Sequence, residues 1–117
     1  MFSSHKPKEL TPAATHAALV ANEITLIDVR EPAETAAARI GGALQFPLSA
    51  FDPKALPDPG GRPIVFHCGS GVRSAKAVEL CRKAGLNIDT HMAGGITAWK
   101  RDGLPIVTQD APAGAAR

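Results

Sequence analysis

The spacing of apolar residues along the chain predicts short strands that alternate with helices. Three mostly apolar runs have the length of buried strands, and they cover residues 24–29, 43–46 and 63–67; a more polar run over residues 87–92 is the fourth predicted strand. Segments with helical spacing or with helix-start residues lie between these runs. Strands that alternate with helices are typical of a parallel sheet covered on both faces. The pattern therefore predicts an α/β fold.

Residues that start or stop helices support two of the predicted helices. Thr11 followed by Pro12 is typical of an N-cap and a first turn, and predicts a helix over residues 10–22. A second helix is predicted over residues 73–84, because its apolar and charged residues fall on opposite faces and Gly85 stands where helices commonly end. Three shorter helical segments are predicted over residues 31–39, 48–56 and 94–103.

The composition is that of an ordinary globular protein, and it narrows the range of partners. Of the 117 residues, 44% are apolar and 21% are charged, which fits one soluble domain. The formal net charge of +2 and the aromatic content of 4% favour neither a nucleic-acid nor a membrane partner. No run approaches the roughly 18 apolar residues of a membrane helix, and the first residues lack the apolar middle of a secretion signal. The two cysteines match neither a disulfide framework nor a zinc site, which favours a reducing, cytoplasmic setting.

The candidate chemistry lies in the loop that joins the third predicted strand to its helix. Cys68 ends the strand, and the glycines at 69 and 71 allow backbone amides to crowd toward one point. Ligands of parallel sheets bind beyond the carboxyl ends of strands. The helix start, the loop amides and Arg73 are all expected to stabilise a thiolate, and so to lower the pKa of Cys68 below the usual value of about 8.5. A buried, inert cysteine is the alternative, but it explains neither the glycines nor the arginine.

Four sequence motifs, in this order, resemble those of the single-domain rhodaneses, which are sulfurtransferases. The motifs are LIDVREPAE, ARIGGALQFPLS, HCGSGVRS and MAGGITAWKRDGLPI. The second departs from the family pattern, with Arg39 where a histidine is common and Gly42 near a frequent proline. The resemblance places a rhodanese-like domain over residues 10–107, with mobile termini at 1–9 and 108–117.

The resemblance implies a fold, a site and a reaction. The fold is a single α/β domain whose parallel five-stranded sheet has helices on both faces. Cys68 matches the catalytic cysteine of the family. It attacks a small sulfur-containing anion or a persulfide donor, such as thiosulfate, and the persulfide that results gives its outer sulfur to a thiol or a thiol-carrying protein. No metal or organic cofactor is implied. The substrate-binding loop comprises Gly69, Ser70, Gly71, Val72 and Arg73.

Other functions remain open at this point. Phosphatases of the cell-division-cycle type resemble rhodaneses but have five residues between cysteine and arginine; here there are four, so that Ser74 stands where the phosphatase arginine would be. A low-turnover persulfide carrier or a redox or regulatory binding module is compatible with the same loop. The donor is also open. Gly69 and Ser70 are neutral where many thiosulfate users have cations, and the letters CGSGV resemble the mercaptopyruvate-using branch.

Several residues outside the loop are expected to be structural. Cys81 falls on the apolar face of its helix, where a free cysteine is usually buried. His67 points to the opposite side of its strand from Cys68. Asp28 and Arg30 are expected to form a buried pair, and Trp99 to anchor the core. Ser74, like Ser70, is able either to donate to a bound anion or to cap the helix.

Overall fold

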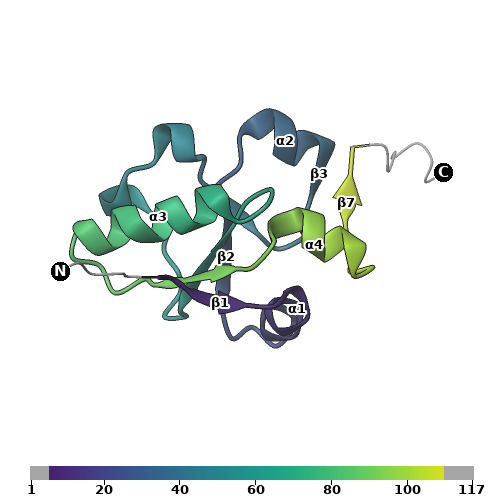
Figure 1. The fold of residues 1–117 in the computed structure, drawn as a ribbon, viewed down its shortest axis with the longest axis horizontal. Helices are drawn as coiled ribbons and strands as arrows, with labels where there is room; N and C mark the ends of the chain where they lie inside the picture. Colours follow the sequence, from purple (N-terminus) through teal and green to yellow (C-terminus); the bar gives the residue numbers. More distant parts are fainter. Residues whose placement is uncertain (1–5, 110–117) are drawn as a thin grey trace.

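Five parallel strands form the centre of the molecule, in the order β1-β6-β5-β2-β4 (Figure 1). The computed structural model describes residues 6–109. Every pair of neighbouring strands in the central sheet is parallel, which confirms the five-stranded parallel sheet of the prediction. The strands are β1 (Lys8–Leu10), β2 (Thr25–Asp28), β4 (Leu44–Gln45), β5 (Ile64–His67) and β6 (Thr90–Met92).

Helices cover both faces of this sheet. On one face, α3 packs against β2 and β5 together with residues 46–56, a stretch that contains two short 3₁₀ segments. On the other face, α1 and α4 pack against β2, β5 and β6. The helices are α1 (Pro12–Val20), α2 (Pro32–Ala37), α3 (Val72–Lys83) and α4 (Gly95–Arg101), and the 3₁₀ segments are η1 (Leu48–Ala50) and η2 (Pro53–Ala55).

The predicted starts and stops of the longer helices are confirmed. The Thr11 side chain accepts a hydrogen bond from the amide of Ala14 at 3.0 Å and so caps α1. Helix α3 ends at Lys83, and Gly85 follows with a φ of +81°. That left-handed conformation suits glycine, which has no Cβ. Among residues 6–109, no helix is both long and apolar enough to cross a membrane.

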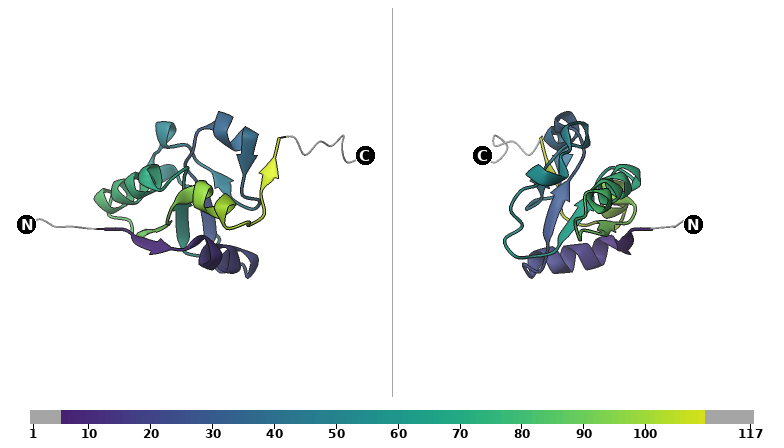
Figure 2. Two further views of the ribbon diagram at one scale, coloured as in Figure 1. Left: turned by 45° about the vertical axis from the view of Figure 1, so that its right-hand side comes forward. Right: turned by 90° about the vertical axis from the view of Figure 1, so that its left-hand side faces the viewer.

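Two pairings differ from the prediction. Lys8–Leu10 forms β1, where the sequence predicted a mobile terminus as far as residue 9 and a helix from residue 10, because this polar segment pairs with β6 at the edge of the sheet. The helix expected over 31–39 ends at Ala37, and Ala38–Arg39 forms β3, antiparallel to β7 (Val107–Thr108) beside α2 (Figures 1 and 2). The Arg30 guanidinium donates to the carbonyl of Ala38 at 2.7 Å. This tertiary bond holds extended backbone in a stretch whose alanines favour a helix.

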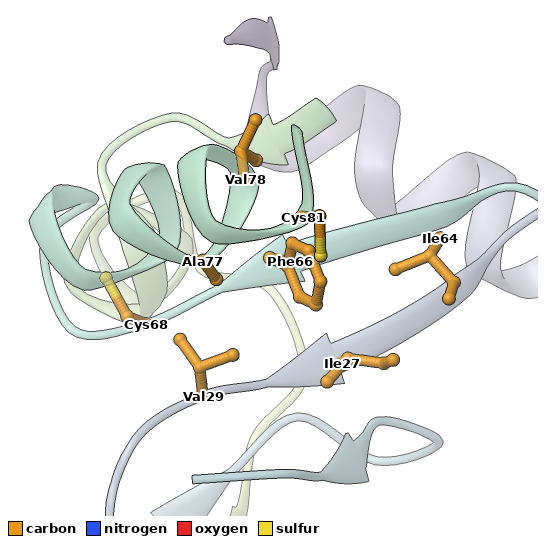
Figure 3. Close-up of a cluster of buried hydrophobic side chains, with 8 residues drawn as sticks. All are labelled: Ile27, Val29, Ile64, Phe66, Cys68, Ala77, Val78 and Cys81. Carbon is orange, nitrogen blue, oxygen red and sulfur yellow. The ribbon is translucent and has the colours of Figure 1, made fainter. Parts of the chain in front are cut away.

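Cys68 lies at the end of a buried apolar cluster between α3 and the sheet (Figure 3). Val29, Phe66 and Ala77 belong to the same cluster and are completely buried. Cys81 is also in this cluster, on α3, and is completely buried, as predicted for a core residue. The cluster therefore fixes both ends of the loop that carries Cys68, through β5 on one side and α3 on the other.

Candidate active site

The loop after β5 folds its backbone amides around the sulfur of Cys68. The Cys68 Sγ accepts hydrogen bonds from the amide of Gly71 at 3.1 Å and from the amide of Ser74 at 3.2 Å. Gly71 caps the start of α3 with a φ of +110°, a conformation that few other residues tolerate. The Cys68 side chain is buried, and it is directed into the first turn of the helix. The cradle that the glycines predicted is therefore present.

The environment of Cys68 favours its thiolate. Burial raises the pKa of Cys68, but hydrogen bonds from the Ser74 side chain and from the amides of Ser74, Gly71 and Ser70 outweigh it, and the pKa lies below the usual thiol value. Burial without such donors raises the pKa of Cys81 to about 11. We therefore expect Cys68 to be the more reactive of the two cysteines at neutral pH, because the thiolate is the nucleophilic form.

The start of α4 forms two backbone hydrogen bonds with this loop. The carbonyl of Cys68 accepts a hydrogen bond from the amide of Ile96 at 2.8 Å, and the carbonyl of Gly69 accepts one from the amide of Thr97 at 3.1 Å. Gly95 allows this approach, since a Cβ at that position would lie 2.5 Å from the carbonyl oxygen of Cys68. These three residues of α4 were not predicted to take part in the site, although two adjacent glycines before a helix were a signal of close backbone contact.

Arg73 is paired with a carboxylate rather than directed to the sulfur. Its guanidinium donates two hydrogen bonds to Glu34 of α2, at 2.6 and 2.9 Å. These bonds lower the pKa of Glu34 to about 2 and raise the pKa of Arg73, so both groups are charged at neutral pH. Arg73 was predicted to be the cation of the loop, and Glu34 was not predicted at all. The positive charge of Arg73 beside the loop is therefore already neutralised by Glu34.

The remaining predicted loop residues differ in exposure. Ser70 and Val72 are exposed, and Val72, with 76% of its surface accessible, is the most exposed of the large apolar residues of the described chain. Gly69 is half-buried beneath the guanidinium of Arg73, whose Nη2 would lie 2.9 Å from a Cβ at this position. Ser74 is completely buried, and its hydroxyl lies 3.5 Å from the Cys68 Sγ. The structure thus brings Ser74 to the sulfur of Cys68, a contact that was not among the two roles considered for it from the sequence.

The polar residues at the ends of β2 and β5 form a separate group on the other face of the sheet. Arg30 pairs with Asp28 at 2.8 Å, and both side chains are buried, as predicted. His67 is completely buried, and its Nε2 lies 3.6 Å from Asp28. Burial lowers the pKa of His67. These residues hold the strand ends together. Trp99 of α4 is buried as well, which confirms its expected place in the core.

Comparison with known proteins decides the family. The model of the rhodanese-like domain matches residues 11–102 of the chain. The chain belongs to the rhodanese-like family. A protein of Synechocystis described as uncharacterised is 42% identical over 76% of this chain, and the match spans half of that relative's length. A protein of Allochromatium vinosum named a sulfurtransferase is 39% identical over 75% of this chain and 82% of its own length.

A solved structure shows the same fold in a rhodanese-related protein. The crystal structure of that protein, from Thermoplasma volcanium, superposes with a TM-score of 0.73 at 31% identity, and the match covers 86% of this chain and 97% of that one. The rhodanese-like fold therefore extends over nearly all of the described residues, including the cradle around Cys68.

Proposed function

We propose that this rhodanese-like protein is a sulfurtransferase that carries sulfane sulfur as a persulfide of Cys68. The observation that supports this best is the buried sulfur of Cys68, which accepts amide hydrogen bonds from Gly71 and Ser74 at the start of α3. Such donors stabilise a thiolate before and after each transfer, because they are already oriented when the charge forms. The Allochromatium vinosum relative named a sulfurtransferase supports the same reaction class.

The proposed reaction has two displacements. The Cys68 thiolate attacks the outer sulfur of thiosulfate, the S–S bond of the donor breaks, and sulfite leaves with the bonding electron pair. An acceptor thiolate then attacks the outer sulfur of the persulfide, and Cys68 leaves as a thiolate. Both steps exchange one S–S bond for another, so they need neither an oxidant nor a reductant. A small thiol or a thiol-carrying protein is the proposed acceptor, in a reducing, cytoplasmic setting.

The direct test is the intact mass of the protein after exposure to thiosulfate. We expect the gain of one sulfur atom, confined to the peptide that carries Cys68, and its loss on addition of cyanide. Sulfur on Cys81 instead, or on neither cysteine, would contradict the proposal. Steady-state turnover with thiosulfate and cyanide then separates an enzyme from a carrier, because a carrier loads one sulfur but turns over slowly.

The ion pair between Arg73 and Glu34 leads to an expectation about the donor. Thiosulfate is a dianion, and the carboxylate of Glu34 competes with it for the guanidinium of Arg73. The native protein should therefore have a high KM for thiosulfate. In Glu34→Gln, which retains an oxygen for the amide of Glu31, the KM should fall about threefold to tenfold, a range that allows for the partial exposure of the pair. The fall should be smaller at high salt, where attraction to the dianion is screened.

Glu23→Gln is the matched control for this measurement. It removes the same charge from an exposed side chain just before the amino-terminal end of β2, whereas the loop follows the carboxyl end of the parallel strand β5. This change should leave the KM unchanged. An unchanged KM in Glu34→Gln, together with a lower kcat, would show that Glu34 positions Arg73 for the reaction rather than competing with the donor.

A further inference from the structure

A line of hydrogen-bonding side chains leads from the sulfur of Cys68 to the edge of the sheet. The Ser74 Oγ lies 3.5 Å from the Cys68 Sγ and 2.7 Å from the Nδ1 of His91. The other ring nitrogen of His91, Nε2, lies 3.3 Å from the carboxylate of Glu9. Ser74 comes from α3, His91 from β6 and Glu9 from β1, the edge strand. The four residues span 82 positions of the sequence between Glu9 and His91, and only the fold brings them together.

Burial changes along this line from one end to the other. Cys68, Ser74 and His91 each expose 3% of their surface or less, whereas the Glu9 side chain is 61% exposed. The thiol of Cys68 is therefore almost completely shielded from solvent. The line of side chains therefore connects the buried thiol of Cys68 to the carboxylate of Glu9 at the surface.

The hydrogen positions follow from the groups that are present. A carboxylate only accepts, so Glu9 favours the form of His91 that carries a proton on Nε2. In the neutral ring, Nδ1 is then an acceptor, and the Ser74 hydroxyl donates to it. The carbonyl of Gly71 is a longer alternative acceptor for that hydroxyl, at 3.2 Å. With its proton directed to His91, Ser74 presents an oxygen lone pair to the thiol of Cys68.

We propose that His91, oriented by Glu9, takes the thiol proton of Cys68 through Ser74. The S–H bond of Cys68 breaks as its proton joins the Ser74 Oγ, and the original hydroxyl proton of Ser74 passes to Nδ1 of His91. The products are a thiolate and an imidazolium that donates from Nε2 to Glu9. Ser74 then donates its hydroxyl to the thiolate, in addition to its amide. His91 and Glu9 are positioning residues in this scheme, which rests on the proposed role of Cys68 as the nucleophile.

Among the residues described around His91, the charged one is Glu9. Its partners in strand register are Glu9 on β1 and Phe66 on β5. From α3 it meets the neutral Ser74, and from the loop the neutral Gly71, where a Cβ would lie 3.8 Å from Cε1 of His91. His67 lies on the opposite face of the sheet. The ionisable side chains along this line are therefore Cys68, His91 and Glu9.

The test is the rate at which iodoacetamide alkylates Cys68 as a function of pH, with the modified peptide identified by mass spectrometry. In His91→Asn, the amide oxygen can still accept from Ser74 but the side chain cannot take a proton. We expect the midpoint of the Cys68 profile to rise by about one pH unit, which slows alkylation about tenfold below the native midpoint. The rates of native and variant proteins should converge at high pH, where both are thiolates.

Glu9→Gln should raise the midpoint in the same direction, with alkylation about threefold slower below the native midpoint. The double variant Glu9→Gln/His91→Asn should have the same midpoint as His91→Asn, because Glu9 acts on Cys68 only through His91. Asp89→Asn is the matched control: this exposed acid precedes β6 and pairs with Lys8 of β1 at 3.6 Å, and its removal should leave the profile unchanged.

An unchanged midpoint in His91→Asn would overturn the proposal, and so would a loss of rate that is equal at every pH. If His91→Asn does not fold, Glu9→Gln carries the test, since the exposed Glu9 side chain is safe to replace. A profile for Glu9→Gln that equals that of Asp89→Asn would then overturn it. Alkylation needs no sulfur donor, so a failure of sulfur transfer leaves this result intact, and the reverse also holds.

Discussion

Replacement of Cys68 by serine is expected to abolish sulfur transfer while the protein still folds. A hydroxyl at this position can accept from the amides of Gly71 and Ser74, as the sulfur does, so the loop should keep its shape. Serine forms no persulfide, and turnover with thiosulfate and cyanide should fall at least about a thousandfold. Steady-state kinetics measures the first effect, and a thermal melt with a transition near that of the native protein measures the second.

Cys81→Ala is the control for the loss of a thiol as such. Cys81 is completely buried on α3, so its truncation should cost about 1 kcal/mol of stability through lost packing. Turnover should stay within a few-fold of the native value. If Cys81→Ala were the inactive variant, the roles of the two cysteines would have to be exchanged.

The second large effect is expected from a methyl group placed beneath the loop. In Gly95→Ala, the new Cβ would lie 2.5 Å from the carbonyl oxygens of Cys68 and Gly69, at a φ of +61°. Backbone atoms cannot give way as the end of a flexible side chain can. We expect a loss of about 3–4 kcal/mol in the free energy of unfolding, measured by denaturant titration, and a loss of turnover because the cradle is displaced.

Gly85→Ala is the control that separates the cost of the steric clash in Gly95→Ala from the cost of placing alanine at a positive φ. Gly85 also has a positive φ, of +81°, but a Cβ there meets nothing within 4 Å. Its replacement should cost about 1 kcal/mol and leave turnover unchanged. Equal losses of stability in the two variants would show that the contact between α4 and the loop is not what makes Gly95 necessary.

The parts of the fold that could be predicted are those set by local pattern. The apolar runs predicted β2 and β5. Helix-start and helix-stop residues predicted α1 and the end of α3. Strand alternation correctly separated His67 from Cys68. Strand β1 has no such pattern, because Lys8 and Glu9 are exposed and the strand exists through its pairing with β6.

The same distinction applies to the candidate site. The glycines and the helix start indicated the amide cradle, because those features are contiguous with Cys68 in the sequence. The partner of Arg73 was not predictable in this way, since Glu34 lies 39 positions earlier, on α2. Nor was the contact of Ser74 with His91, which depends on how α3 lies over β6. Spacing within one segment carries no information about which distant segment it will meet.

The contact between α4 and the loop also has an electronic consequence. The amide of Thr97 donates to the carbonyl of Gly69. The N–H at the other end of that same peptide unit, on Ser70, is one of the backbone amides that lower the pKa of Cys68. Hydrogen bonds in series polarise one another. Withdrawal of electron density at the Gly69 oxygen makes the Ser70 N–H a stronger donor. Helix α4 therefore supports the thiolate of Cys68 indirectly, through a single intervening peptide group.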